Sequence, residues 1–352
     1  MTFINQGGIS LTKEKAMKMF EEKNKIKIID FGSDRRVCTN TGLKFDQYIG
    51  YDNFDKNINA WLDDFEEEEK EVILKLLANY TYVPESIYGG YLDDLLDQII
   101  LKCNMDEAIL NSTYFITFPS SKGVKSGGDI IRAELPLGHL DTISKDQLIS
   151  NVEMNIKNIK SSAKCIVFID DIVGTGKTAM KNVEKGLKDL GEIKNVKVIL
   201  AAMYAQEDVI SNIKEQLKEK KHNIEFVLLN KCEKCMKEQY IFDAEELKSN
   251  YPIISKYEEK VAGKKIGIKG SNAMGYENAQ FLLSFYYNTP NNTLCIFWKP
   301  TETNYPPFLR TSFKRPNIDD IVKNRKNRKE NAYEARKLFR TKHEGNIDIV
   351  LS

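Results

Sequence analysis

The residues best suited to chemistry lie within positions 165–178, which read CIVFIDDIVGTGKT. Two adjacent carboxylates, Asp170 and Asp171, follow five apolar residues, and a small-residue segment begins three positions later at Gly174. Carboxylates accept hydrogen bonds from sugar hydroxyls. The free amides of a loop that opens a helix form a cradle for a phosphate. The spacing therefore predicts a site for a sugar phosphate.

The elements on either side of these residues support that interpretation. The unbroken apolar run at 165–169 is typical of a strand buried on both faces of a parallel sheet. Residues 179–190 have the amphipathic pattern of a helix. A P-loop is excluded because it needs a glycine five residues before the Gly-Lys pair, where this chain has Asp171. The alternative is an ordinary strand-to-helix turn that contains GTGKT by chance.

The stretch resembles the phosphoribosyl-diphosphate-binding motif of the type I phosphoribosyltransferases, which combines an apolar strand, two acidic residues, two apolar residues and a loop rich in Thr and Gly. The resemblance implies that Asp170 and Asp171 are catalytic residues that hold ribose hydroxyls. It also implies phosphoribosyl diphosphate or a related nucleotide as ligand and Mg²⁺ as cofactor, with no direct protein ligand to the metal and the two aspartates beyond its first coordination sphere. The residues expected to bind the 5′-phosphate are Gly174, Thr175, Gly176, Lys177 and Thr178.

The rest of the chain predicts an α/β fold with a doubly wound, mostly parallel sheet of the type I phosphoribosyltransferase kind. Strands are expected at 113–118, 165–169, 196–203 and 225–229, with helices at 179–190 and 209–219. Strands that alternate with helices at this spacing form parallel sheets. Ligands bind such sheets at the carboxyl ends of the strands, where the acidic pair falls.

Other elements are expected on weaker patterns. We expect a strand at 129–135 that carries Arg132, a helix capped by Ser144 that runs to about residue 159, and a strand at 294–298. Residues 32–53 are interpreted as irregular. Before them, residues 11–22 have a helical pattern, which returns from Ile58 and again at 91–101. The predicted organisation is a mostly helical N-terminal module at 1–108, an α/β core at 109–312 and a basic tail at 313–352.

Two further segments supply candidate substrate-binding residues. The loop after the strand at 113–118 contains Lys122 and Lys125, which could face a pyrophosphate, although a mobile surface loop is the alternative. The segment NTPNNT contains Asn291 and Asn292 and is either a turn or part of a site.

The order of the segments WLDDFEEEEKEVILKLL, the acidic pair with its loop, GYENAQFLL and NTPNNTLCIFW resembles the phosphoribosyltransferase-like proteins of bacterial conflict systems, including retron-associated ones. The resemblance covers most of residues 55–310 and implies an effector in anti-phage defence.

Composition limits the partners and the location. The 352 residues have a net charge of +1, which gives no global attraction to nucleic acid or to a membrane. No apolar run is long enough to cross a bilayer and no signal peptide is evident, so a cytoplasmic protein is expected. Six scattered cysteines indicate reduced thiols. Cys232 and Cys235 form a CxxC pair without the four ligands of a zinc site, and their role stays open.

The tail has a charge balance unlike that of the whole chain. Residues 314–343 contain eleven Lys or Arg and four Asp or Glu, so eleven minus four leaves +7. A nucleic-acid or nucleoprotein partner is one interpretation and a solvated helix is the other. A homo-oligomer is also left open.

Two functions follow from these residues. The first is a phosphoribosyltransferase-like enzyme with glycosyltransferase or nucleotide-glycosidase chemistry. The second is a catalytically silent module that senses a nucleotide and docks on a nucleic-acid or protein partner. Gly174 leaves the second function open, because purine-salvage members of the family with the same TGKT ending carry an aspartate at that position, where it serves as the base.

Overall fold

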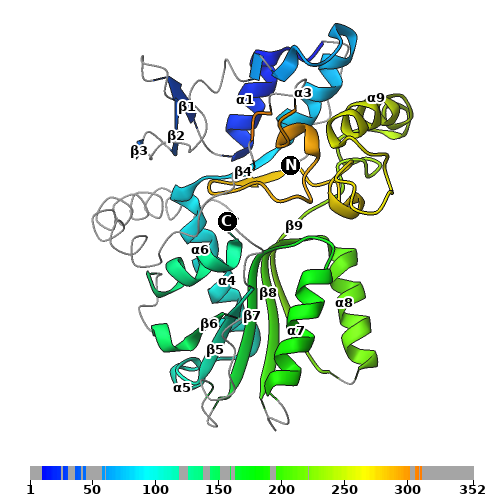
Figure 1. Cartoon of the computed structure of the whole chain (residues 1–352). Coiled ribbons are helices and arrows are strands. Elements are labelled where there is room, and N and C mark those ends of the chain that lie inside the picture. Colours follow the sequence, from blue (N-terminus) through cyan, green and yellow to red (C-terminus); the bar gives the residue numbers. More distant parts are fainter. Residues whose placement is uncertain are drawn as a thin grey trace, which may run out of the picture.

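The computed structural model describes residues 10–24, 27–30, 36–40, 43–44, 58–59, 61–118, 126–137, 143–150, 159, 163–190, 196–220, 222–301, 306–308 and 310. Lys122, Lys125 and the basic tail at 313–352 lie outside the described residues. The described chain forms two lobes, a sheet lobe and a helical lobe, which are stacked in Figure 1. No described helix has the length and apolarity that a membrane span requires.

The sheet lobe is built on five parallel strands, and β7 is the central one. Side chains of successive strand residues point to opposite faces. Ile166 and Phe168 therefore join the core on one face, and Val167 and Ile169 join the core on the other. This explains why the run is apolar without alternation. The strand order is β6 (Leu148–Ser150), β5 (Thr113–Thr117), β7 (Cys165–Val173), β8 (Lys197–Ala205) and β9 (Glu225–Lys231).

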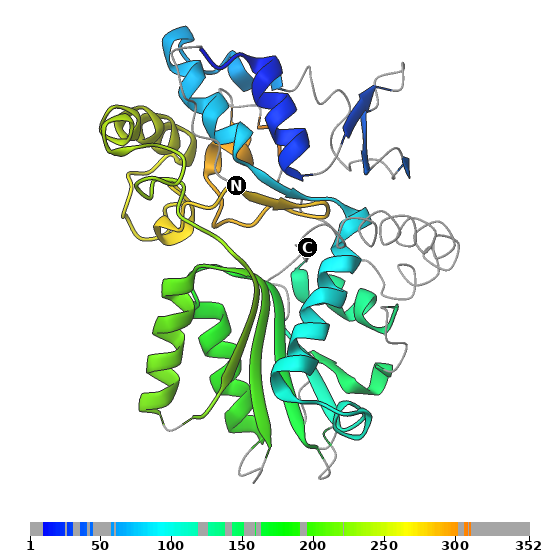
Figure 2. The ribbon, with the colours of Figure 1, turned by 180° about the vertical axis from the view of Figure 1, so that it is seen from behind.

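Helices cover both faces of this sheet, as Figures 1 and 2 show from opposite sides. One face packs against α7 (Lys177–Leu190) and α8 (Glu207–Glu219). The other packs against α4 (Glu85–Cys103) and α6 (Gly127–Glu134). The short helix α5 (Glu107–Leu110) leads into β5. The doubly wound α/β fold expected from the sequence is confirmed.

The helical lobe contains segments from both halves of the chain. Its helices are α1 (Lys13–Asn24), α3 (Lys70–Ala78), which follows the turn η1 (Glu67–Glu69), and α9 (Ala244–Ala262). Its core holds Tyr80 stacked on Phe308, with ring centroids 4.2 Å apart. The parallel pair β4 (Thr81–Val83) and β10 (Leu283–Phe285) lies between the lobes.

The predicted division at residue 108 does not follow this packing. The helix α4 precedes that boundary, yet it packs on the sheet, whereas α9 and Phe308 follow it and belong to the core of the helical lobe. Residues 32–53 are also not wholly irregular. There β2 (Arg36–Asn40) pairs antiparallel with both β1 (Lys27–Asp30) and β3 (Leu43–Lys44).

Three predicted elements are wrong. Residues 127–134 form helix α6 instead of a strand, because Ser126 and Asp129 form a capping box that starts a helix. After Ser144 comes the short turn η3 (Lys145–Gln147) and then β6, because the Gln147 amide donates to the carbonyls of Leu110 and Thr113, each at 2.8 Å.

The third wrong prediction is the strand expected at 294–298. This segment instead contains the 3₁₀ turn η6 (Cys295–Phe297). Its backbone N–H groups at Cys295 and Ile296 donate to the Glu258 carboxylate instead of to a neighbouring strand.

Candidate functional site

The acidic pair lies at the carboxyl end of the central strand. Asp170 pairs in register with Ala202 of β8, and the strand continues to Val173. The side chain of Asp170 is half-buried, whereas Asp171 is only 4% exposed. The Asp171 backbone N–H donates to the Asp170 carboxylate at 3.1 Å. The site that the sequence predicted is therefore at the sheet edge where parallel folds bind ligands.

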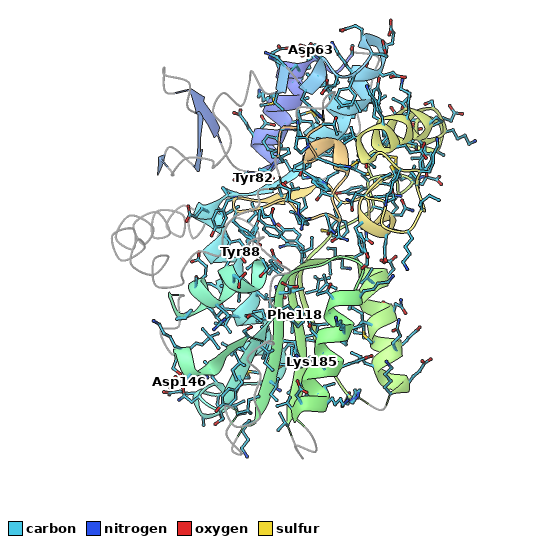
Figure 3. All side chains as sticks on the ribbon, in the orientation of Figure 1. Asp63, Tyr82, Tyr88, Phe118, Asp146 and Lys185 are labelled. Atoms are coloured by element: carbon cyan, nitrogen blue, oxygen red, sulfur yellow. The ribbon has the colours of Figure 1, made fainter. Side chains whose placement is uncertain are left out.

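Groups from three other parts of the chain lie around Asp171. The Tyr287 hydroxyl donates a hydrogen bond to its carboxylate. A Cβ atom at Gly127 would lie 2.0 Å from the same carboxylate, so only glycine fits at the start of α6. The third group, Tyr88, lies between the lobes with its ring edge-on to that of Tyr287 at 5.8 Å (Figure 3). The Tyr88 hydroxyl is buried and has no hydrogen-bond partner among the described residues.

Burial dominates the electrostatics of the pair. It raises the pKa of Asp170 well above its usual range, and the neighbouring Asp171 charge raises that pKa further. Burial also raises the pKa of Asp171, although the Tyr287 hydrogen bond opposes this. Two adjacent carboxylates with so little water hold on to a proton. A nearby cation or additional hydrogen-bond donors would favour full ionisation of the pair.

The loop after β7 presents backbone amides at the start of α7. The first N–H groups of a helix have no partner within the helix and carry the positive end of its dipole. Gly176 adopts φ +78°, which glycine tolerates best, and a Cβ there would also lie 3.0 Å from Val209 and Ile213 of α8. Lys177 and Thr178 are exposed. Backbone amides at the start of the helix and an exposed lysine thus lie together, which is the arrangement expected of an anion-binding loop.

A segment of the helical lobe covers this loop, and we call residues 274–293 the hood. Asn292 is 8% exposed, and its side chain lies against Gly174, where an added Cβ would come within 2.3 Å of Asn292 Oδ1. Glu277 forms an ion pair with Lys177. The Asn291 carbonyl accepts from the N–H of Tyr276 at 2.7 Å, a contact within the hood. The structure thus brings Asn292 to the loop and gives Asn291 a main-chain contact.

Several residues at the site were not expected from the sequence. Tyr287 and Asp171 are 116 positions apart, and Lys177 and Glu277 are 100 apart. No local pattern links such residues. The Gly127-Gly128 pair was the one available signal, because consecutive glycines often mark a close approach of other atoms to the backbone.

The CxxC pair, Cys232 and Cys235, has no companion metal ligands among the described residues. The described residues contain no group of three His, Cys, Asp or Glu able to hold a metal ion. Burial raises the pKa of the Cys232 thiol to about 12, so it is protonated at neutral pH. Cys235 is fully buried.

The parallel sheet with an acidic pair and a short Gly-Thr-Gly loop at its carboxyl edge is the arrangement of a phosphoribosyltransferase-like protein. Comparison with protein families agrees with this class. Residues 58–310 match the PRTase-CE family, and because this match covers most of the chain, the protein belongs to that family. Neither the curated proteins nor the solved structures gave a match.

Proposed function

We propose that the protein binds phosphoribosyl diphosphate or a related nucleotide together with Mg²⁺ and transfers or hydrolyses at the anomeric carbon, as an effector of anti-phage defence. The observation that carries the binding site is the position of Asp170 and Asp171 at the end of β7, beside the loop that opens α7. The defence role rests on the resemblance of the segment order to effectors of bacterial conflict systems.

The two carboxylates have different roles in this proposal. Asp170 is half-buried and accepts hydrogen bonds from the ribose hydroxyls. Asp171 already accepts from Tyr287, so a second hydroxyl shares this carboxylate or replaces the tyrosine. The loop amides and the N-terminus of α7 hold the 5′-phosphate.

The residues fit a magnesium ion that is bound mainly through the ligand. Mg²⁺ is usually held by one or two carboxylates together with substrate phosphates and water. The raised pKa of Asp170 indicates a carboxyl group whose negative charge lacks compensation, which a nearby cation would provide. When bound, the ion would neutralise charge on the diphosphate as it leaves.

Catalysis would rely on positioning and on electrostatic stabilisation. Departure of a diphosphate from the anomeric carbon leaves an oxocarbenium-like centre, which ordered carboxylates stabilise. Position 174 supplies no carboxylate as base, and the neutral Asn292 amide lies there instead. We therefore expect an acceptor that does not need a base from this loop.

A silent sensor is the second candidate, and the closed hood favours it. The Tyr287–Asp171 bond and the contact of Asn292 with Gly174 fill positions that a ligand would use. Binding of a nucleotide would then displace the hood and alter the surface offered to a partner. Release of pyrophosphate by the pure protein distinguishes an enzyme from such a sensor.

The direct test is calorimetry with phosphoribosyl diphosphate and Mg²⁺. We expect the variant Asp170→Asn with Asp171→Asn to lose binding while its melting temperature stays close to that of the wild type. Asp97→Asn, at an exposed position on α4, is the control and should bind normally. Unchanged affinity in the double variant would remove the assignment. Loss of phage protection in cells that express the double variant would support the defence role.

A further inference from the structure

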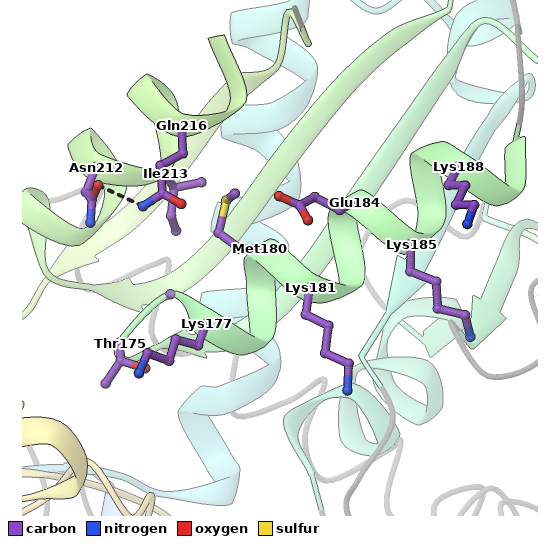
Figure 4. Close-up of a pocket in the computed structure, with 11 residues that line it drawn as sticks. Thr175, Lys177, Met180, Lys181, Glu184, Lys185, Lys188, Asn212, Ile213 and Gln216 are labelled. Carbon is purple, nitrogen blue, oxygen red and sulfur yellow. Dashed lines mark hydrogen bonds between the residues drawn. The ribbon is translucent and has the colours of Figure 1, made fainter. Parts of the chain in front are cut away.

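A row of lysines follows the exposed side of α7. Lys177, Lys181, Lys185 and Lys188 are spaced by four, four and three residues, which places them on one face of a helix. All four are exposed. Successive lysines are separated along the helix axis by about 6, 6 and 4.5 Å, so the row spans about 16.5 Å. Figure 4 shows Lys181 and Lys185 pointing to the same side of the helix.

These lysines line a groove that continues from the phosphate loop. The groove has a volume of about 590 Å³ and begins at Thr175 and Gly176. Its other wall is α8, which contributes the amides of Asn212 and Gln216, joined by a hydrogen bond of 2.9 Å. Met180 and Ile213 supply its apolar surface. None of the described residues that line it is aromatic.

The charges in the groove do not cancel. Lys177 is paired with Glu277, and Glu184, the carboxylate that lines the groove, is paired with Lys220. Lys181, Lys185 and Lys188 form no ion pair with another described residue. Three adjacent positive charges are thus left on the α7 side of the groove, and the α8 side contributes neutral amides.

From this arrangement we infer that the groove between α7 and α8 binds the phosphodiester backbone of a nucleic acid. A row of ammonium groups at regular spacing suits a repeating anion, and phosphate contacts need only point charges. The amides can hydrogen-bond phosphate or sugar oxygens, and the apolar surface can contact sugars. Because these contacts go to phosphates and sugars and not to base edges, we expect binding that is independent of sequence. The groove shares Thr175, Gly176 and Lys177 with the proposed phosphate loop, but the inference rests on Lys181, Lys185 and Lys188, which lie outside that loop.

The size of the effect follows from counterion release. Each phosphate contact on a single strand contributes about 0.7 to the slope of log K against log salt. Three lysines therefore contribute about 2 to that slope. Between 1 M and 0.1 M salt, a slope of about 2 corresponds to a factor of about 100 in the affinity that these three lysines contribute.

The test compares full-length variants by fluorescence anisotropy with labelled 20-nucleotide single-stranded DNA, single-stranded RNA and duplex DNA. We expect Lys181→Gln with Lys185→Gln and Lys188→Gln to bind about 100-fold more weakly at 0.1 M salt and to have a slope smaller by about 2 on a single strand. The same three positions changed to arginine should retain binding, because the charge is kept.

The matched control changes to glutamine three exposed lysines outside α7 and α8, Lys248, Lys260 and Lys269. Its net charge equals that of the glutamine variant, so it separates a local site from a general charge effect, including that of the basic tail. Equal affinities and slopes for the two triple variants would overturn the inference. Absence of nucleic-acid binding by the wild type would also overturn it. Polyglutamate serves as a second probe: if the glutamine variant lost binding to polyglutamate but kept binding to nucleic acid, the groove would instead suit an acidic protein partner, and the inference would be overturned.

Discussion

Replacing Glu258 by glutamine should change how the stability of the helical lobe depends on pH. Glu258 lies on α9 and is fully buried. Its carboxylate accepts from the backbone N–H groups of Met274, Cys295 and Ile296 at 2.6, 3.0 and 2.9 Å. These residues lie at the start of the hood and just after its end, so one buried carboxylate anchors both sides of the segment that covers the site.

The direction of the effect follows from two opposing contributions. Burial raises the pKa of Glu258 from 4.5 to about 7, and the three N–H donors only partly oppose this. The folded pKa is therefore higher than the unfolded one. The stabilising contribution is complete below pH 4.5 and is lost as the pH rises through about 7. The difference corresponds to about 3 kcal/mol of unfolding free energy at 1.36 kcal/mol per pKa unit.

Glutamine is nearly isosteric with the protonated acid and does not titrate. We therefore expect Glu258→Gln to match the wild type near pH 5 to within the loss of one hydrogen bond, about 1 kcal/mol. Between pH 5 and 8 the wild type should lose up to about 3 kcal/mol relative to the variant. Urea unfolding monitored by tryptophan fluorescence measures this difference in stability. Both tryptophans report on the segment near Glu258, because Trp61 donates to the carbonyl of Ile296 and Trp298 donates to that of Thr293.

The adjacent Glu259 provides a control of opposite sign. Its pKa is lowered by the hydrogen bond from Lys265, so the wild type should gain stability over Glu259→Gln as the pH rises through the acid range. Parallel pH profiles for wild type and Glu258→Gln would refute the reasoning. If the unfolding free energy of the wild type instead rises relative to that of Glu258→Gln as the pH rises, the hydrogen bonds from the three amides outweigh the effect of burial on the pKa.

Four further predictions concern the site and the tail. Gly174→Ala should push against Asn292 and destabilise the protein by about 1–3 kcal/mol in urea unfolding; Asn292→Ala should relieve part of this loss in the double variant, and simple additivity would contradict the contact. Affinity for phosphoribosyl diphosphate and Mg²⁺ should rise with pH as Asp170 loses its proton, and calorimetry should find this dependence flattened in Asp170→Asn. Nucleotide formation from hypoxanthine or guanine should be negligible, since base assistance is worth about 10²–10⁴-fold; robust turnover would mean that another residue is the base. Deleting 314–352 should leave the melting temperature nearly unchanged and weaken salt-dependent binding to a partner, whereas a large drop would show that the tail packs in the core.

The sequence alone was sufficient for four of the five strands of the sheet, β5, β7, β8 and β9, and for the position of the acidic pair. An unbroken apolar run that meets a Gly-rich turn and an amphipathic helix has few structural solutions, so β7, the loop and α7 could be predicted from neighbouring residues. The alternation of strands and helices then required parallel pairing, which placed Asp170 and Asp171 at the edge that binds ligands.

Only the tertiary structure decided what covers the site and how the helical lobe is built. The hydroxyl of Tyr287 reaches Asp171 across 116 positions, and Asn292 lies on Gly174, because the C-terminal half of the chain packs back against the N-terminal helices. The apolar run at 294–298 resembles a strand locally, yet its amides bond to Glu258 and it becomes a turn. A local sequence pattern indicates which residues are buried. The partner of a buried polar group is set by packing between distant segments, so the contacts of the hood could not be predicted from the sequence.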